Sequence, residues 1–576
     1  MHPKDHDNLS GRAKLRFAVL CDANELPAAH ANCIKELLAI PDIELTLLII
    51  NSASSSPGND RSKSHSIFRF TNLFWMLYMR LCNLGEIARC RQSDMAALFK
   101  PIPRLDCRRI LDDQCCEQFH HDDVATIRGY GLDFILSLGF GFVCGDILEA
   151  AKYGVWSFHY GDETKSIGGP PAFWEIYHDE TVTAGSLQRL THHFEGSVVL
   201  QKGFIATKKY SPRQNLEAIM WATSYMPARV CRDLLRERAQ YLNALPPDTK
   251  VSAFKNPGNI ELLSFLFKAV ASWLKHQVES ILFLEDWNVG IVREPIHSFL
   301  DPNFCPHVEW LAYQRHDSFL ADPFLLQIGA KLKLLAEEFD WHSNRGHIVE
   351  ADITDAGQSA PCFRKALDEG VHMSYPYLFE YGGRWYCTPE TSQKRGVFLY
   401  VYDTEKQVLT PVSILIPDFA AVDPTLFQYQ QRWWLFCTNL DDEVLSKLFV
   451  WHAPRLEGPW EPHPGNPVKL DVRSSRPAGR PFFFQDRLYR PAQDCSATYG
   501  GAITINQVTS LTADEFSEEP AVHIGPVAES IYRRGIHTAA YQGSVTVVDG
   551  KRMIPAPGFA LRTLKHKLTK LFGQKG

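Results

Sequence analysis

The sequence predicts a multidomain protein in which an α/β domain precedes an all-β propeller of five blades. Strand and helix signals alternate along the first 210 residues, which is typical of an open, mostly parallel sheet. From residue 283 the pattern changes to short strands that recur about every 50 residues. We therefore divide the 576 residues into an α/β domain (13–210), a helical connector (211–282), a propeller (283–558) and a basic amphipathic tail (559–576).

The elements of the first domain follow one another in a βαβ order. Continuous apolar runs at 15–23 and 43–52 predict buried parallel strands, and the residues between them predict a helix. A strand at 133–141, a helix over 146–154 and the strand "VWSFHY" at 155–160 continue the pattern. Ligands of open α/β sheets bind at the carboxyl ends of the strands, so His159 is a candidate site residue.

The second half of the chain contains an internal repeat of a proline, an apolar strand, a turn and an aromatic-rich strand. The prolines stand at 323, 376, 424 and 481, and Thr538 occupies the next comparable position. Five units of about 50 residues predict a five-bladed β-propeller.

Equivalent positions of the innermost strands of a propeller surround its central channel. The residues before the five landmarks should therefore converge there: Asp322, Tyr375, Asp423, Arg480 and His537. A second ring is expected at the ends of the second strands: Glu337, Glu390, Asn439 and Asp494. Acids and bases at one channel mouth indicate a binding site for a polar ligand. The alternative is that the acids bond backbone amides of neighbouring blades.

Composition and charge exclude several classes of protein. With 45% hydrophobic and 22% charged residues the chain is globular. Its 60 Lys and Arg are outnumbered by 66 Asp and Glu, which disfavours a nucleic-acid partner. The fourteen cysteines contain no C-x-x-C pair, so reduced thiols are expected and no metal site is indicated.

The N-terminus has no apolar signal core and the chain no uncharged apolar run of about 18 residues, so we expect a cytoplasmic protein. Two segments could touch the inner face of a membrane peripherally. One is the apolar run 67–84, interrupted by Arg69 and Arg80, and the other is the lysine-rich tail 561–576. Docked helices or a frayed tail are the alternative.

The segment "VWSFHYGDETKSIGGPPAFWEI" (155–176) ends a strand on His159 and continues into a loop, a Gly-Gly-Pro turn and a helix. This layout resembles the N-terminal catalytic domain of the 10-formyltetrahydrofolate-dependent formyltransferases, over about residues 13–210. The resemblance implies a Rossmann-like fold and 10-formyltetrahydrofolate as the cofactor. Its loops would include Gly139, Gly141, Gly168 and Gly169.

In that family a histidine is the base, an asparagine two residues before it stabilises the oxyanion, and an aspartate orients the histidine. Carried over to this chain, His159 matches the base, whereas Ser157 and Glu195 stand at the other two positions. Asp162 is an additional acid that could replace a missing partner. The alternative is that His159 is a core histidine bonded to backbone.

The predicted propeller resembles the five-bladed fold of furanosidase- and fructosidase-type glycoside hydrolases. It is also similar to the N-terminal domain of plant glucosamine inositolphosphorylceramide transferases, in which it is an accessory unit. The hydrolase resemblance makes Asp322 the attacking acid and Asp423 the acid that steadies the transition state, and puts Asp494 in the place of the proton donor.

Together these features predict an enzyme that transfers a formyl group to an amino sugar in polysaccharide or glycolipid biosynthesis, with the propeller binding the glycan. One alternative is a glycoside hydrolase or transglycosylase in the propeller with a degenerate first domain. Another is a protein that binds glycans without turning them over.

Overall fold

The computed structural model describes residues 14–51, 74–75, 77–78, 90–107, 109–111, 116–139, 142–165, 170–171, 173–192, 196–245, 257–313, 315, 317–353 and 361–555. The chain forms two compact units, which are described one at a time. Unit 1 comprises Met1–Gly203 and Thr207–Ser272, and unit 2 comprises Phe204–Ala206 and Trp273–Gly576.

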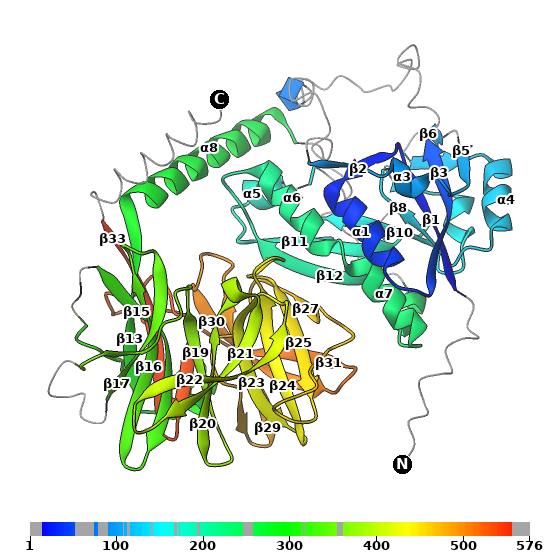
Figure 1. Ribbon diagram of the computed structural model, residues 1–576. Helices are drawn as coiled ribbons and strands as arrows, with labels where there is room; N and C mark the ends of the chain where they lie inside the picture. Colours follow the sequence, from blue (N-terminus) through cyan, green and yellow to red (C-terminus); the bar gives the residue numbers. More distant parts are fainter. Residues whose placement is uncertain are drawn as a thin grey trace, which may run out of the picture. The chain divides into compact units, whose positions relative to one another are not determined.

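A seven-stranded sheet is the centre of unit 1 (Figure 1). In spatial order its strands are β12 (Val198–Ala206), β11 (Val182–Arg189), β10 (Val155–Tyr160), β8 (Phe134–Ser137), β1 (Leu15–Cys21), β3 (Ile43–Asn51) and β5 (Arg104–Cys107). The five strands from β10 to β5 pair in parallel, and β11 pairs antiparallel with β10. Unit 1 is therefore a mixed sheet with helices, and its assignment to the formyltransferase fold stays a prediction.

Helices cover both faces of this sheet. On one face, α4 (His121–Gly129) and the 3₁₀ helix η4 (Asp146–Glu149) contribute to an apolar cluster that contains Val155 of β10. On the other face, α1 (Ala28–Leu38) stacks His30 on Phe158 of β10. The helices α6 (Pro212–Thr223) and α7 (Met226–Leu235) contact α1. The helix expected over 146–154 is shorter than predicted, because only the single turn of η4 forms.

Smaller elements surround the sheet of unit 1. They are β2 (Glu25–Pro27) paired with β4 (Gln92–Asp94), β6 (Arg109–Leu111) and β9 (Phe142–Val143) paired with β7 (Cys116–Phe119), the helices α3 (Ala96–Phe99) and α5 (Trp174–Tyr177), and the 3₁₀ helix η5 (Gln240–Asn243).

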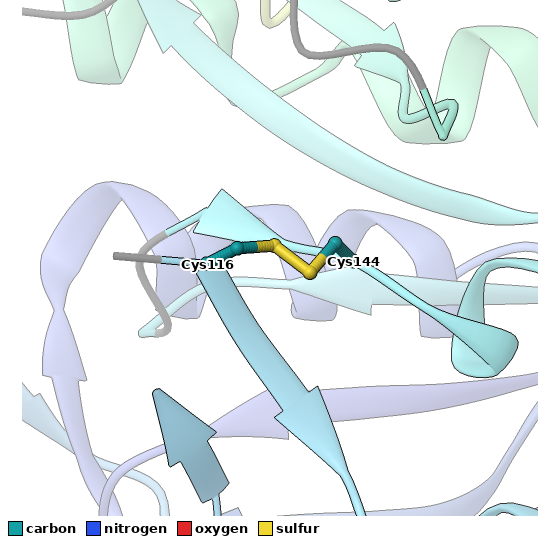
Figure 2. Close-up of a disulfide and its surroundings, with 2 residues drawn as sticks. All are labelled: Cys116 and Cys144. Atoms are coloured by element: carbon teal, nitrogen blue, oxygen red, sulfur yellow. A yellow bond between two sulfur atoms is a disulfide. The ribbon is translucent and has the colours of Figure 1, made fainter. Parts of the chain in front are cut away.

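A disulfide joins Cys116 of β7 to Cys144, which follows β9 (Figure 2). The parallel pairing of β7 with β9 brings the two cysteines together, with their Cα atoms 6.0 Å apart. The expectation that the thiols are reduced is therefore wrong for this pair. The spacing of the cysteines did not predict this disulfide because 28 residues separate Cys116 from Cys144.

The long helix α8 (Asn259–Leu282) begins in unit 1 and ends in unit 2. Leu262 and Phe265 near its start are buried against Trp75 and Phe173. Among the helices that the structure describes, none has both the length and the apolar character needed to cross a membrane.

Unit 2 is a five-bladed β-propeller, as the repeat predicted (Figure 1). Blade 1 consists of β15 (Ser318–Ile328), β16 (Lys331–Asp340), β17 (Arg345–Asp352) and β18 (Arg364–Leu367). Blade 2 consists of β19 (Ser374–Tyr381), β20 (Arg384–Glu390), β21 (Gly396–Asp403) and β22 (Val408–Pro417). Blade 3 consists of β23 (Ala421–Tyr429), β24 (Arg432–Asn439), β25 (Lys447–Ala453) and β26 (Glu461–Pro462), with β27 (Lys469–Leu470) also paired to β25. Blade 4 consists of β28 (Phe482–Phe484), β29 (Arg487–Asp494), β30 (Ala502–Leu511) and β31 (Phe516–Ile524).

Blade 5 closes the ring with strands from both ends of the unit. It consists of β14 (Glu309–Trp310), β13 (Phe283–Val292), β33 (Val545–Pro555) and β32 (Ala539–Gln542), and the short 3₁₀ helix η6 (Ile296–Leu300) follows β13. In Figure 1 the red strand β33 runs beside the green strand β13 with which it pairs. This pairing joins the first and last strands of the propeller, so the ring has no open edge at its closure.

Candidate functional site

Proline-bearing bulges turn two acids into the channel of the propeller. The ladder of each of the first three inner strands is interrupted at its Pro motif: Asp322-Pro323, Tyr375-Pro376 and Asp423-Pro424. Proline has no N–H for the ladder, so a bulge accommodates it. The preceding residues all have a left-handed backbone, with φ of 50° at Asp322, 44° at Tyr375 and 51° at Asp423. Such backbone strain tends to occur at functional sites.

Asp322, His537 and Asp549 form a buried chain of charged groups. His537 lies 2.6 Å from Asp549 through Nδ1 and 3.5 Å from Asp322 through Nε2. The hydroxyl of Thr538 donates to Asp322 at 2.7 Å. Burial raises the pKa of Asp322 to about 6, although His537 beside it acts in the opposite direction. Burial lowers the pKa of His537, but the two aspartates outweigh it and raise that pKa overall.

Asp423 is held by a bidentate ion pair. Arg476 donates to it from Nε at 2.6 Å and from Nη2 at 3.3 Å, and the amide of Gln493 donates at 2.9 Å. Only 1% of Asp423 is exposed, and burial raises its pKa to about 6 against the effect of Arg476. A fixed planar guanidinium with spare N–H groups is suited to binding hydroxyl or anionic oxygens.

Glu337 and Glu390 add two further buried carboxyl groups. Burial is the main cause that raises the pKa of each, and Asp322 raises both further, whereas Arg476 acts in the opposite direction on the pKa of Glu390. Ser392 donates to Glu390 at 2.9 Å, and the imidazole of His372 lies 3.8 Å from Glu337. A protonated carboxyl donates a hydrogen bond and an ionised one accepts, so the cluster offers both functions to a ligand.

Aromatic rings line the same part of the channel. Trp287 of β13 lies with its ring 4.1 Å from the ring of His537, and Tyr499 lies 5.5 Å from it. Lys551 is 1% exposed, and its ammonium group lies 5.2 Å from the centre of the Trp287 ring. Aromatic faces beside polar groups are a common surface for sugar rings and other amphipathic ligands.

Three of these side chains could hold a cation. Among the described residues, Asp322, His537 and Asp549 have ligand atoms that all lie within 4.8 Å of one another. Carboxylate oxygens with one imidazole suit a divalent cation of intermediate hardness. His537 also forms ion pairs with both aspartates, and Asp549 accepts hydrogen bonds from the backbone N–H groups of Asp322 and His537.

The predicted rings are only partly brought together. The structure gathers Asp322, Glu337, Glu390, Asp423 and His537 in one buried cluster. Arg480 is directed elsewhere, since it donates to the carbonyl of Leu378 and its guanidinium lies 5.8 Å from the Tyr541 ring. Asp494 accepts from the N–H of Ser496 at 2.9 Å and lies 3.7 Å from His523.

Three residues of the cluster were not predicted from the sequence: Arg476, Gln493 and Asp549. Gln493 is the neighbour of the predicted Asp494, and alternation along β29 puts the two side chains on opposite faces. Since Gln493 bonds Asp423, it is the member of that pair that faces the channel. Arg476 precedes Pro477, which stands 53 residues after Pro424 and pairs with Ala492 of β29, so the fourth unit of the repeat belongs at Pro477 and not at Pro481. Asp549 has no counterpart in the repeat.

In unit 1 the candidate base His159 ends strand β10 in a mostly buried position. Its Nε2 atom is buried and has no hydrogen-bond partner among the described residues. A Cβ built on Gly161 would lie 3.4 Å from this atom and 3.6 Å from Oε1 of Glu175, so both groups face the same side of Gly161. Burial lowers the pKa of His159 and raises that of Glu175 to about 7.

The other predicted residues of unit 1 have different surroundings. Ser157 lies two residues before His159 on β10 and so on the same face of the strand. Asp162 accepts from Lys202 at 2.9 Å and from Thr164 at 2.7 Å. Gly139 lies against the backbone of Asp22, where a Cβ would come within 2.9 Å of a backbone nitrogen. The other four candidates lie outside the described residues: Gly141, Gly168, Gly169 and Glu195.

Comparison with known proteins identifies relatives of the propeller. Residues 305–537 match the family model described as glucosamine inositolphosphorylceramide transferase 1, N-terminal. The protein of that name from Oryza sativa subsp. japonica is 34% identical over 263 residues, which is 43% of this chain and 35% of the rice protein. The one from Arabidopsis thaliana is 32% identical over 210 residues, 35% of this chain and 27% of the relative. This chain thus spans about a third of the length of the rice protein.

Solved structures with similarity to this chain include glycoside hydrolases. A thermostable family-43 glycoside hydrolase is 13% identical, with a TM-score of 0.30, over 37% of this chain and 81% of that chain. A family 117 glycoside hydrolase from Zobellia galactanivorans is also 13% identical, with a TM-score of 0.30, over 42% of this chain and 87% of that chain. The predicted resemblance of the propeller to the N-terminal domain of the plant transferases is confirmed for residues 305–537.

Proposed function

We propose that this chain is a transferase that acts on a sugar-bearing lipid or glycan and that the propeller channel binds an amino sugar of it. The observation that carries this proposal is the single buried cluster of five carboxyl groups around Arg476 and His537. The plant relatives, whose name specifies glucosamine and an inositolphosphorylceramide, support a sugar-bearing lipid as the substrate class.

The charges of the cluster favour an amine over a neutral sugar. Five acids, Asp322, Glu337, Glu390, Asp423 and Asp549, outnumber the cationic groups that face them, which are Arg476, His537 and His372. An ammonium group would offset this excess of acids through charge-assisted hydrogen bonds. The sugar ring would lie on the face of Trp287 or Tyr499, and its hydroxyl groups would bond the remaining polar atoms.

Calorimetric titration of the full chain with glucosamine and with N-acetylglucosamine tests this proposal. We expect glucosamine to bind at least about tenfold more tightly, because acetylation removes the charge that pairs with the acids. Asp423→Asn should weaken glucosamine binding by a similar factor. Asp494→Asn is the matched control, since Asp494 bonds Ser496 outside the cluster, and it should bind as the unaltered chain does. Equal affinity of the two sugars, or full binding by Asp423→Asn, would contradict the proposal.

The second part of the proposal concerns the reaction, which is formyl transfer to an amine with His159 of unit 1 as the base. In transfer of a formyl group to an amine, the nitrogen attacks the carbonyl carbon and must lose a proton. Burial lowers the pKa of His159, so its imidazole is neutral at pH 7 and can accept that proton through the unpaired Nε2. Gly139 lies close to the backbone of Asp22, as expected of a loop that packs near a bound cofactor. A reduced folate would supply the formyl group when bound; the bond between the formyl carbon and the folate nitrogen would break, and that nitrogen would take up a proton.

This reaction predicts two measurable properties of the full chain. A reduced folate should bind with a dissociation constant below about 1 mM, and formyl release with an amino-sugar acceptor should be lost in His159→Ala. His120→Ala is the control, because His120 is exposed at the start of α4. Absence of folate binding would refute formyl transfer and leave the sugar-binding channel unaffected.

A further inference from the structure

Helix α8 exposes an apolar face along its whole length. Nine of its 24 residues are large apolar side chains in exposed positions: Ile260, Leu263, Leu266, Phe267, Val270, Trp273, Leu274, Val278 and Leu282. Phe267 is 76% exposed and Ile260 is 82% exposed. By contrast, only Leu262 and Phe265 of this helix are buried.

The exposed side chains form one broad surface. With 3.6 residues per turn they cover an arc of about 180° on a helix about 36 Å long. This arc is wider than the seam of a two-stranded coiled coil, which uses two positions in seven. Phe74 and Leu77 extend the surface near the start of α8, since Phe74 donates its backbone N–H to Asn259 at 2.8 Å and both side chains are exposed.

The sequence that follows the strand paired with the end of α8 is basic. Phe283, which follows the last residue of α8, pairs with Pro555 at the end of β33. The sequence continues after Pro555 with residues 556–576. They contain five Lys and Arg and no Asp or Glu. Trp and Leu on one helix face beside a basic segment are the features with which proteins bind anionic lipid surfaces.

We propose that α8 docks on a membrane surface that contains anionic lipids. Its exposed apolar face enters the boundary between headgroups and acyl chains, and the cations of 556–576 bind the acidic headgroups. The same face would hold the propeller and unit 1 at the surface where a sugar-bearing lipid resides. This inference goes beyond the proposed function and does not depend on it, because it concerns lipids without sugar.

Flotation of the full chain with vesicles tests the proposal. The vesicles consist of phosphatidylcholine with about 30% phosphatidylserine and contain no glycolipid. We expect the unaltered chain to float, and the double variant Phe267→Gln, Leu274→Gln to partition at least about tenfold more weakly. The matched control is Val412→Gln, Ile414→Gln, which replaces exposed apolar residues of β22 in the propeller and should float as the unaltered chain does.

A second measurement requires the substitution of only one side chain on the apolar face. Brominated lipids should quench more tryptophan emission in the unaltered chain than in Trp273→Phe, because Trp273 is 48% exposed on this face. Failure of the unaltered chain to float, or equal flotation of the α8 double variant, overturns the proposal. A concentration-dependent dimer that this double variant abolishes also overturns it, since a second copy then covers α8. Loss of glucosamine binding in Asp423→Asn with normal flotation separates the two proposals.

Discussion

Replacing Arg476 by methionine tests the electrostatics of the channel. The substitution removes the guanidinium that donates to Asp423 at 2.6 and 3.3 Å and keeps an unbranched side chain of similar length. Asp423 is 1% exposed, so water does not take the place of the lost donors. The amide of Gln493, at 2.9 Å, is the donor that stays.

The size of the effect should depend on pH. In the folded chain the pKa of Asp423 is raised from 3.8 to about 6. A raised pKa means that the carboxyl contributes its full stability below pH 3.8 and that this contribution is lost as the pH rises through 6. Above pH 6 the unaltered chain therefore shows no further loss from this group.

Without the guanidinium the folded pKa of Asp423 rises further, so the variant continues to lose stability above pH 6. Each pH unit corresponds to about 1.4 kcal/mol. Relative to the unaltered chain, the variant should lose about 1.4 kcal/mol at pH 7 and about 2.7 kcal/mol at pH 8 from this cause. Below pH 6 the variant differs from the unaltered chain only by the loss of the hydrogen bonds that Arg476 donates, which contribute about 1 kcal/mol to stability.

Urea unfolding followed by tryptophan fluorescence at pH 5.5, 7 and 8 measures these differences. Eight of the 13 tryptophans lie between residues 283 and 555, so the signal reports mainly on the propeller. The control is the double variant Arg476→Met, Asp423→Asn, in which the additional loss above pH 6 should disappear. An equal loss at pH 5.5 and pH 8 in Arg476→Met would refute the reasoning.

Three further changes have distinct expected outcomes. In unit 1 the pKa of Glu175 is raised from 4.5 to about 7, so its contribution to stability is lost as the pH rises through that range. Measured by urea unfolding, Glu175→Gln should be about 3 kcal/mol more stable than the unaltered chain at pH 8 and differ little from it at pH 4.5. A Cβ on Gly479 would lie 1.9 Å from the carbonyl oxygen of Ala539, and Gly479 has a φ of 132°. Gly479→Ala should therefore lower the free energy of unfolding by about 2–4 kcal/mol. Gly525→Ala is the control and should not lower it, because the space around Gly525 is open. If the propeller hydrolyses glycosides, Asp322→Asn should abolish release of reducing sugar and His159→Ala should not; the reverse result would assign the chemistry to unit 1.

The fold of unit 2 could be predicted because its repeat has a local cause. A proline at the bulge of each of the first three inner strands leaves a mark in the sequence, and the residue before it is placed by backbone geometry. This is why Asp322 and Asp423 were predicted correctly as neighbours in space. The partners of these acids come from other strands, with side-chain directions set by packing across blades. Asp549 therefore could not be derived from the repeat, and Arg476 was missed because the fourth unit was aligned on Pro481 in place of Pro477.

Strand parity explains the one place where the second ring was misaligned. Glu337 and Glu390 lie 14 residues after their prolines, whereas Asp494 lies 13 residues after Pro481, and the channel face in blade 4 belongs to Gln493. A shift of one residue moves a side chain to the opposite face of a strand. In unit 1 the strand pattern placed His159 near the end of β10, where it lies, and its role stays a prediction. No feature of the sequence pointed to Glu175, which lies on α5.

The excess of acids in the channel links ligand binding to protons. Full ionisation would leave an excess of negative over positive charges in a space removed from water, which is strongly unfavourable. The raised pKa values of Asp322, Glu337, Glu390 and Asp423 indicate that the free channel keeps protons instead. An ammonium group that enters the cluster stabilises the ionised carboxyls and should displace protons, so amino-sugar binding should tighten as the pH rises from 5 to 7. Calorimetry in two buffers of different ionisation enthalpy measures the protons released, and a value of zero throughout this range would argue against an amine in the channel.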